Sequence, residues 1–183
     1  MIEQLNTPDY WNGKWAKKET SGKWGEKGYH FLKDLLPEKE SFTALDIGCG
    51  RGAGLSYLIN YFPKAQFVGV DYSQTAIDFA KEKLKGSTAF LFVDDAYKYV
   101  GGNFDYVFLI EILEHLRWPE KVLENYLPIF NKAIYISIPE HTMKCKEHLY
   151  AYPKTVNPFE GYGAKFLGQI DGRRKYVIEK VNK

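Results

Sequence analysis

The segment EILEHLRWPE, residues 111–120, places two glutamates and a histidine within five positions. Glu111, Glu114 and His115 have the spacing i, i+3 and i+4, which brings side chains to one face of a helix. Two carboxylates and an imidazole that converge can bind a divalent cation or move a proton, and they can also simply meet water where a helix begins. The spacing therefore leaves three interpretations open: a metal site, an acid–base cluster and a solvated helix start.

A glycine-rich segment, LDIGCGRGAG, forms the second candidate site. Gly48, Gly50 and Gly52 directly follow a short apolar run. Glycine permits a sharp turn and close approach of a ligand to the backbone, and a helix that begins here offers unpaired N–H groups. Together with Ala53, the first two glycines fit the G-x-G-x-x-A pattern of dinucleotide sites, and Asp71 follows about 20 residues later. A nicotinamide-dependent oxidoreductase is therefore one candidate function.

Acidic residues near these glycines favour a different nucleoside ligand. Asp46 precedes the glycines, where its carboxylate would repel a pyrophosphate but attract an ammonium group. Asp94 and Asp95 follow a later apolar run, where they could accept hydrogen bonds from an adenine amino group.

The residues between these motifs alternate between apolar strands and amphipathic helices. Strands are expected at 43–47, 66–71, 89–93, 106–110 and 133–138, with helices between them. Strands that are apolar on both faces are typical of a parallel sheet covered on both sides, which predicts an α/β fold. The segment 165–181 should form two strands around Asp171 and Gly172, so the mostly parallel, seven-stranded sheet should end in a C-terminal antiparallel hairpin.

The bulk composition predicts one domain spanning residues 1–183. A net charge of +2 gives no reason to expect nucleic acid or an anionic membrane as a partner. Two cysteines, Cys49 and Cys145, do not make a disulfide framework. No stretch approaches the roughly 18 apolar residues of a membrane span. A cytoplasmic protein without membrane contact is expected, while its oligomeric state does not follow from the sequence.

Taken together, the segments LDIGCGRGAG, VGVDYS, VDDA and FDYVFLIEILEHL resemble, in order and spacing, the motifs of class I S-adenosylmethionine-dependent methyltransferases. The resemblance covers roughly residues 43–138. It implies a Rossmann-like three-layer sandwich, S-adenosyl-L-methionine as cofactor, and an enzyme that transfers a methyl group.

The resemblance also implies a cofactor-binding set. Asp71 would accept hydrogen bonds from both ribose hydroxyls of the cofactor. Asp95 would accept a hydrogen bond from the adenine N6 amine, and Tyr72 would lie against the adenine ring. Asp46 and the Gly48–Gly52 loop would line the methionine end and the ribose. The full set is Asp46, Gly48, Cys49, Gly50, Gly52, Asp71, Tyr72, Asp94, Asp95 and Ala96, with Cys49 as a small filler.

The E-x-x-E-H pattern resembles two branches of the superfamily. One is the ubiquinone-biosynthesis type of O-methyltransferase, and the other is the small-RNA 3′-end 2′-O-methyltransferases, which hold a divalent ion. The implied catalytic residues are His115, Glu111 and Glu114. If a metal such as Mg²⁺ or Mn²⁺ binds, Glu111, Glu114 and His115 would hold it together with a later histidine, His148 in preference to His141. Metal-free roles, with His115 as a lone general base or a packed histidine, remain open.

Two aromatic-rich segments are expected to form the acceptor pocket: the N-terminal lid at residues 1–40 and a substrate loop at residues 139–163. The leading hypothesis is methyl transfer to a small-molecule or glycan acceptor, at oxygen. The alternatives are metal-dependent RNA 2′-O-methylation, a nicotinamide-dependent oxidoreductase, and a non-catalytic protein that binds the cofactor.

Overall fold

The computed structural model of the chain describes residues 5–17, 23–99, 101–140 and 145–181. The α-helices are α1 (Pro8–Trp15), α2 (Lys23–Lys27), α3 (Ala53–Tyr61), α4 (Gln74–Lys83) and α5 (Pro119–Tyr126). The 3₁₀ turns are η2 (His30–Asp34), η3 (Leu113–His115) and η4 (Glu160–Tyr162). The strands are β1 (Thr43–Ile47), β2 (Gln66–Asp71), β3 (Phe90–Val93), β4 (Phe104–Ile110), β5 (Phe130–Pro139), β6 (Lys165–Ile170) and β7 (Arg173–Glu179).

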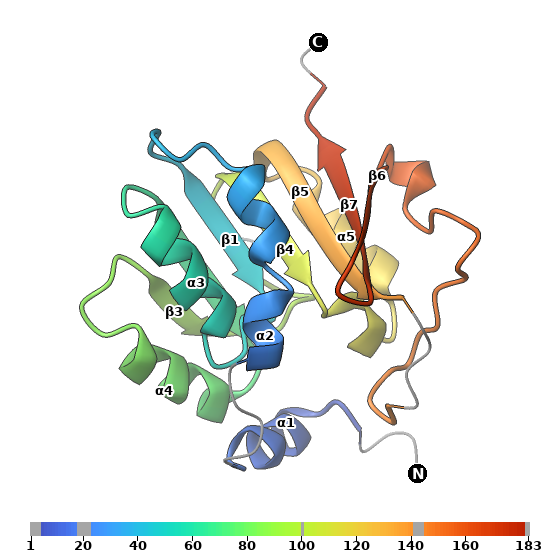
Figure 1. Ribbon diagram of the computed structural model, residues 1–183. Coiled ribbons are helices and arrows are strands. Elements are labelled where there is room, and N and C mark those ends of the chain that lie inside the picture. The colour runs from blue at the N-terminus through green and yellow to red at the C-terminus, as the bar shows by residue number, and fades with distance from the viewer. Residues whose placement is uncertain (1–4, 18–22, 100, 141–144, 182–183) are drawn as a thin grey trace.

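The strands form one seven-stranded sheet in the order β3-β2-β1-β4-β5-β7-β6 (Figure 1). β1 to β5 pair in parallel, whereas β7 pairs antiparallel with both β5 and β6. Asp171 and Gly172 form the hairpin turn with φ angles of 52° and 70°, the left-handed conformation of a two-residue hairpin turn. The predicted α/β sandwich with a C-terminal antiparallel hairpin is confirmed.

Apolar residues cover both faces of the sheet and make three layers. Leu55 and Leu58 of α3 and Ile77 of α4 belong to the core on one face. Val122 and Tyr126 of α5 belong to the core on the other face. The helix boundaries follow local signals: the Ser73 hydroxyl accepts a hydrogen bond from Ala76 N at the start of α4, and Pro119 occupies the first turn of α5.

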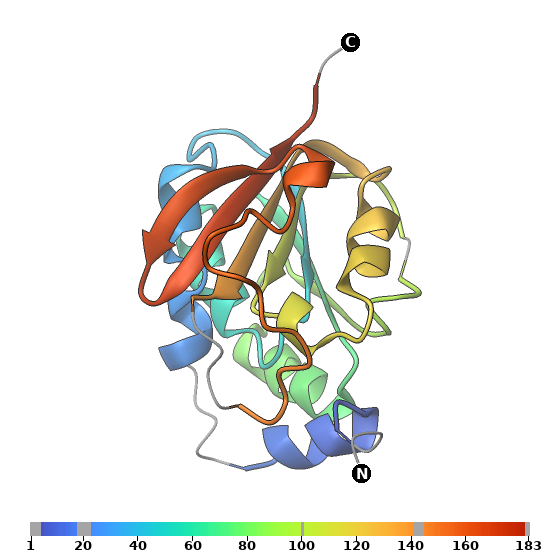
Figure 2. The ribbon, with the colours of Figure 1, turned by 90° about the vertical axis from the view of Figure 1, so that its right-hand side faces the viewer.

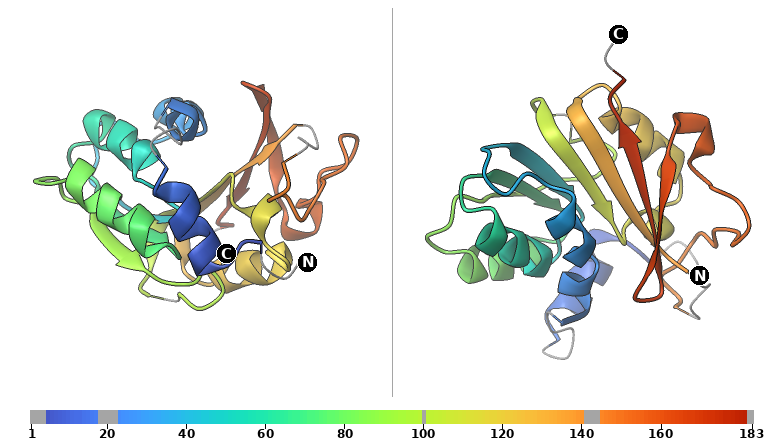
Figure 3. Two further views of the ribbon diagram at one scale, coloured as in Figure 1. Left: turned by 90° about the horizontal axis from the view of Figure 1, so that it is seen from below. Right: turned by 45° about the horizontal axis from the view of Figure 1, so that its top comes forward.

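The carboxyl ends of the parallel strands share one edge of the sheet, and two further segments reach that edge. Because β7 runs antiparallel, its first residue, Arg173, pairs with Pro139 at the end of β5. Helix α1 lies across the same edge, between α4 and the yellow segment with η3 and α5 (Figure 3, left). Residues 145–164 run from this region along the molecule to β6 (Figure 2).

Before β1, the helical spacing of Tyr29, Leu32 and Leu36 predicts a short helix that ends at Pro37. The structure has the short 3₁₀ turn η2 there instead. No helix in the ranges given above is long and apolar enough to span a bilayer.

Candidate active site

A cavity of about 1090 Å³ lies at the carboxyl ends of the parallel strands. It is lined by residues from the loops after β1, β2, β3 and β4, by α1, and by the segment after β5. The sequence-predicted residues on its wall are Gly48, Cys49, Gly50, Asp71, Tyr72, Asp94, Asp95, Ala96, Glu111, His115 and His148. The fold therefore gathers most of the predicted cofactor and acceptor residues around one space.

The loop after β1 has a backbone that requires glycine. Gly48 and Gly50 have φ angles of 77° and 54°, a region that L side chains rarely adopt. A Cβ atom on Gly48 would also lie 2.6 Å from the Ile112 Cδ1 atom. The loop thus exposes backbone to the cavity at a place where a side chain would be both strained and obstructed.

Asp71 at the end of β2 is a fixed hydrogen-bond acceptor. Its Oδ2 atom accepts from Gly50 N at 2.9 Å, and its Oδ1 atom accepts from Ser73 N at 2.9 Å. Burial raises the pKa of Asp71, while the hydrogen bonds from backbone N–H groups act in the opposite direction. The carboxylate is therefore oriented by the glycine loop and by the start of α4 before any ligand arrives.

The acidic pair after β3 also lines the cavity and is ordered locally. Asp94 Oδ1 accepts from Asp95 N at 2.7 Å, and Asp95 Oδ1 accepts from Tyr97 N at 3.0 Å. Tyr72 donates its hydroxyl to the Asn6 carbonyl oxygen at 3.0 Å, which links the end of β2 to the N-terminal segment. Burial raises the pKa of the Cys49 thiol well above its usual value, so this residue is a neutral group.

Asp46 and Gly52 are placed differently from the expectation that they line the cavity. Asp46 is fully buried, and the Tyr29 hydroxyl lies 2.8 and 2.9 Å from its two carboxylate oxygens. Burial raises the pKa of Asp46 to about 7. Tyr29, rather than Asp46, contributes to the cavity wall. Gly52 packs under α4, where a Cβ atom would lie 3.1 Å from Ala80 Cβ.

The E-x-x-E-H motif does not lie along an α-helix. Glu111 has a left-handed backbone with a φ angle of 54°, and Leu113–His115 form the single 3₁₀ turn η3. Glu114 is only 1% exposed, so a solvated helix start is the wrong interpretation for it. Burial, followed by the charge of Glu111, raises the pKa of Glu114 well above its usual value.

The two ring nitrogens of His115 differ, because only Nδ1 has a backbone hydrogen-bond partner in the part of the chain that the structure describes. Its Nδ1 atom lies 3.1 Å from the Glu147 carbonyl oxygen. Because a carbonyl oxygen only accepts, Nδ1 carries the proton and Nε2 keeps its lone pair. Burial lowers the pKa of His115 to about 4. The imidazole is therefore neutral at physiological pH, with Nε2 ready to accept a proton or bind a cation.

Three of the four proposed metal ligands come together. Single ligand atoms of Glu114, His115 and His148 lie within 4.8 Å of one another. Glu114 Oε2 is buried and has no hydrogen-bond partner among the described residues. Glu111 is not part of this group; its carboxylate meets Ser137 Oγ at 2.6 Å and Arg173 Nε at 3.1 Å. His141, the alternative ligand, lies outside the described residues.

Helix α1 crosses the cavity and is attached on both sides. The Asn12 Oδ1 atom accepts from Ser73 Oγ at 2.7 Å and from Thr75 N at 3.1 Å at the start of α4. On the opposite side, Tyr10 and Lys14 both contact the Glu147 carboxylate. Trp11 and Trp15 of the same helix stack with centroids 6.1 Å apart and line the cavity.

Several residues of this site were not identified from the sequence: Asn12, Ser137, Glu147, Arg173 and Lys175. Arg173 and Lys175 follow the predicted Asp171-Gly172 turn in a run of three basic residues, RRK. That run was the available signal, because the first residue of an antiparallel strand after a hairpin lies beside the end of a neighbouring strand.

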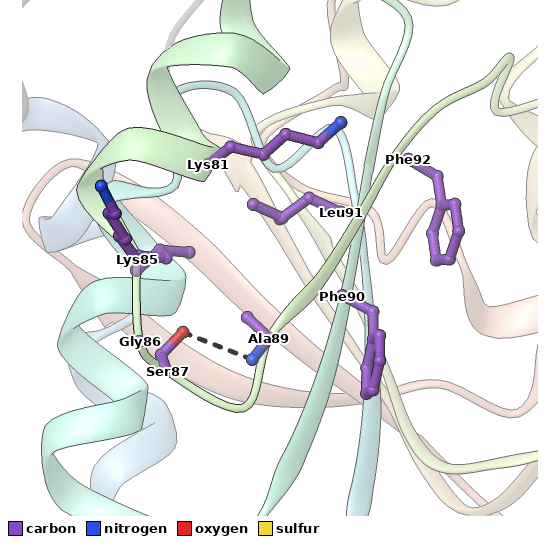
Figure 4. A pocket seen from close by; sticks show the side chains of 9 residues that line it. Lys81, Lys85, Gly86, Ser87, Ala89, Phe90, Leu91 and Phe92 are labelled. Carbon is purple, nitrogen blue, oxygen red and sulfur yellow. Dashed lines mark hydrogen bonds between the residues drawn. The ribbon is translucent and has the colours of Figure 1, made fainter.

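A second, smaller hollow of about 330 Å³ lies between α4 and β3 (Figure 4). Leu91 points toward α4 in this view, whereas Phe90 and Phe92 project from the other side of β3. It contains none of the residues predicted to bind cofactor or acceptor. The larger cavity is therefore the candidate active site.

The chain is similar to methyltransferases in sequence and in fold. Residues 45–130 match a family model described as a methyltransferase domain. The uncharacterized phycocyanin operon protein W of Pseudanabaena tenuis is 34% identical over 62 residues, which are 34% of this chain and 58% of that protein. The (S)-coclaurine N-methyltransferase of Papaver somniferum is 32% identical over 83 residues, 43% of this chain and 24% of that enzyme.

Solved methyltransferase structures resemble the fold of this chain. The plantazolicin methyltransferase BpumL, solved with S-adenosylhomocysteine, is 25% identical, with a TM-score of 0.56 over 74% of this chain and 55% of that chain. The N-methyltransferase NodS of Bradyrhizobium japonicum, also solved with S-adenosylhomocysteine, is 16% identical, with a TM-score of 0.74 over 97% of this chain and 100% of that chain. The predicted methyltransferase fold is confirmed.

The matches define the limits of the assignment. The chain covers 58% of the cyanobacterial protein and 55% of BpumL. Two of the relatives, the poppy enzyme and NodS, are N-methyltransferases by name. Oxygen as the acceptor atom, a ubiquinone-type branch and a bound metal ion therefore stay predictions.

Proposed function

We propose that this protein transfers the methyl group of S-adenosyl-L-methionine to a small-molecule acceptor, at oxygen. The observation that carries this proposal is the convergence of the glycine loop, Asp71 and the acidic pair after β3 with Glu111 and His115 on one cavity. The volume of this cavity, about 1090 Å³, exceeds the usual ~300–1,000 Å³ of a pocket for one ligand. The cavity is therefore large enough to hold the cofactor and the acceptor together.

The cofactor end of the cavity suits an adenosine group. Asp71 presents oriented carboxylate oxygens for the two ribose hydroxyls, and Asp95 presents an acceptor for the adenine amine. Because Asp46 is buried behind Tyr29, the ammonium group of the methionine part would contact the loop backbone and Tyr29 instead. The methyltransferase family match favours this cofactor over a nicotinamide nucleotide.

The acceptor end contains a group that can take up a proton. Methyl transfer forms a bond from the acceptor oxygen to the methyl carbon and breaks the bond from that carbon to sulfur. The sulfonium becomes a neutral thioether, and the hydroxyl proton passes to His115 Nε2. The neutral state of His115 supports this role, because the low pKa of about 4 keeps the lone pair available.

The N-terminal segment at residues 1–40 and the loop at residues 139–163 are proposed to form the acceptor pocket. Trp11, Trp15, Leu149 and Tyr150 from these segments all line the cavity. Aromatic walls suit a flat or sugar-like molecule and surround the sulfonium with ring faces. A glycan acceptor belongs to this proposal, whereas the near-neutral net charge gives no support to an RNA acceptor.

A divalent metal ion is the alternative proposal for this end of the cavity, because a His115 Nε2 atom that binds a metal ion cannot also take up the proton. Glu114, His115 and His148 fit such an ion, since Glu114 Oε2 is buried without a hydrogen-bond partner among the described residues and His115 Nδ1 is held by a backbone carbonyl. When bound, the ion would polarise an acceptor oxygen. Two imidazoles and one carboxylate favour Mn²⁺ or another transition metal over Mg²⁺.

The methyl-transfer proposal is tested by incubating the protein with methyl-labelled cofactor and matched panels of hydroxyl and amine acceptors. We expect labelled product from hydroxyl compounds, and a loss of at least tenfold in His115→Gln. Label on amines alone would contradict the oxygen assignment, and release of no labelled product from any acceptor would contradict catalysis.

The metal proposal is tested separately by calorimetric titration of the chelator-treated protein with Mn²⁺. Binding with one ion per chain that disappears in His148→Ala is the expected result. Glu111→Gln is the matched control, since Glu111 lies outside the three-residue group. Equal binding by wild type and His148→Ala would contradict the assigned ligands.

A further inference from the structure

A chain of buried polar contacts leads from β7 to the cavity wall. Lys175 Nζ donates to Ser137 Oγ at 2.7 Å, and Ser137 Oγ donates to Glu111 Oε1 at 2.6 Å. Ser137 and Lys175 are 0% and 1% exposed, and they are paired residues in the register of β5 and β7. Arg173, two residues before Lys175, meets the other carboxylate oxygen of Glu111 at 3.1 Å.

The direction of these hydrogen bonds is set by the chemistry of lysine. An ammonium group only donates, so the Ser137 oxygen must accept from Lys175 and its single proton is left for Glu111. Burial lowers the pKa of Lys175 to about 8, so the amine remains protonated at neutral pH. Lys175 also donates to the Gly28 carbonyl oxygen at 3.1 Å and lies over the Phe31 ring.

The Glu111 carboxylate is consequently held in one orientation. Its Oε1 atom accepts a hydrogen bond from the Ser137 hydroxyl, and its Oε2 atom faces the guanidinium of Arg173. Its backbone is held as well, because Glu111 N donates to the Ser137 carbonyl oxygen at 3.0 Å. This support offsets the cost of the left-handed backbone at Glu111.

We propose that Lys175 and Ser137 are positioning residues that orient the Glu111 carboxylate toward the acceptor, so that Glu111 accepts a hydrogen bond from the acceptor while His115 takes the proton. This inference rests on the proposed methyl transfer. It adds that Glu111 orients the acceptor, whereas His115 removes its proton. A buried lysine is costly to retain without a function for its charge, and here that charge is directed at the cavity wall.

The test compares Lys175→Met, Ser137→Ala and Glu111→Gln, alone and combined. We expect Lys175→Met and Ser137→Ala each to lower kcat about tenfold, the loss of one charge-assisted hydrogen bond, with an unchanged dissociation constant for S-adenosylhomocysteine. In the Glu111→Gln background, Lys175→Met should cause no further loss, and Ser137→Thr, which keeps the hydroxyl, should retain most of kcat.

A matched control is Arg174→Met. Arg174 is the neighbouring buried cation on β7, 3% exposed, but it donates to the carbonyl oxygens of Pro153 and Tyr152 instead of supporting Glu111. Its effect on kcat should be the same with and without Glu111→Gln. An equal fold-loss from Lys175→Met in both backgrounds would show a general structural role and overturn the proposal.

Crystal structures of Lys175→Met and Ser137→Ala provide a readout that does not depend on turnover. The Glu111 carboxylate should leave the wild-type orientation or occupy several, while the β5–β7 pairing is unchanged. An unmoved carboxylate in both variants would overturn the positioning role. If wild type transfers no methyl group, the proposed function fails, whereas the crystal structures still decide whether this support of Glu111 exists.

Discussion

Glu111 and Glu114 lie three residues apart, yet they have opposite surroundings. Glu111 faces the cavity with Ser137 and Arg173 as partners. Glu114 is buried, lies away from the cavity wall and is grouped with His115 and His148. The sequence identified these residues by type and spacing but could not separate their roles, because the groups that separate them come from β5, β7 and the loop after β5.

Asp46 gives a prediction at the level of a single residue. Burial raises its pKa to about 7 in the folded protein, from the usual 3.8. The folded state therefore binds a proton that the unfolded state has lost, and the free energy of unfolding falls as pH rises from about 4 through about 7. Asp46→Asn, which keeps the shape without the charge, should remove this loss.

The measurement is urea unfolding of wild type and Asp46→Asn at pH 5 and pH 8. The variant should gain stability relative to wild type at pH 8, on the order of a few kcal/mol more than at pH 5. Asp78→Asn, at an exposed site on α4, controls for the loss of a carboxylate. The same stability difference at both pH values would rule out a raised pKa for Asp46.

Among the elements, the strands and the helices between them followed the sequence closely, because apolar periodicity, Ser73 and Pro119 are local signals. Helix α1 was not predicted from the sequence. Its N-cap Thr7 was a readable signal, but none of its residues is buried, so no apolar stripe marked it. Its position depends on polar contacts with α4 and with the loop after β5, which are remote in sequence.

Glu147 gives a prediction for α1. Burial alone would raise its pKa, but hydrogen bonds from Cys145, Tyr10 and Lys14 outweigh this effect and hold the pKa below its usual range. Glu147→Gln removes the charge that Tyr10 and Lys14 share. We expect S-adenosylhomocysteine to dissociate about tenfold faster, as the loss of hydrogen bonds to a charged group implies.

Stopped-flow displacement of bound S-adenosylhomocysteine measures this rate. Glu124→Gln on α5, whose partner is Tyr162, is the matched control and should dissociate at the wild-type rate. A wild-type rate for Glu147→Gln would mean that α1 does not retain the cofactor.

For the whole molecule, the sequence predicted the layers and the terminal hairpin but not how they are joined. Insertion of β7 between β5 and β6 brings Arg173 and Lys175 to the active-site edge, and strand order is a long-range property. The predicted third strand, β3, lies at an edge of the sheet, where Phe90 and Phe92 are 57% and 47% exposed.

This edge gives a prediction for the molecule as a whole. Phe92→Lys should reduce aggregation of concentrated protein, because a charge on an exposed apolar edge strand opposes pairing between molecules. The unfolding temperature should stay unchanged, since the Phe92 side chain is already 47% exposed. Light scattering during heating is the measurement; an unaltered onset would show that this edge does not drive association.

Calorimetric titration with S-adenosylhomocysteine tests whether the loops after β1, β2 and β3 form the cofactor site. Wild type should bind one ligand per chain, and Asp71→Ala should weaken binding at least tenfold through loss of the ribose acceptor. Asp78→Ala on the exposed face of α4 should bind like wild type. Equal affinity of wild type and Asp71→Ala, or binding of NADH in place of S-adenosylhomocysteine, would show that these loops do not form the proposed cofactor site.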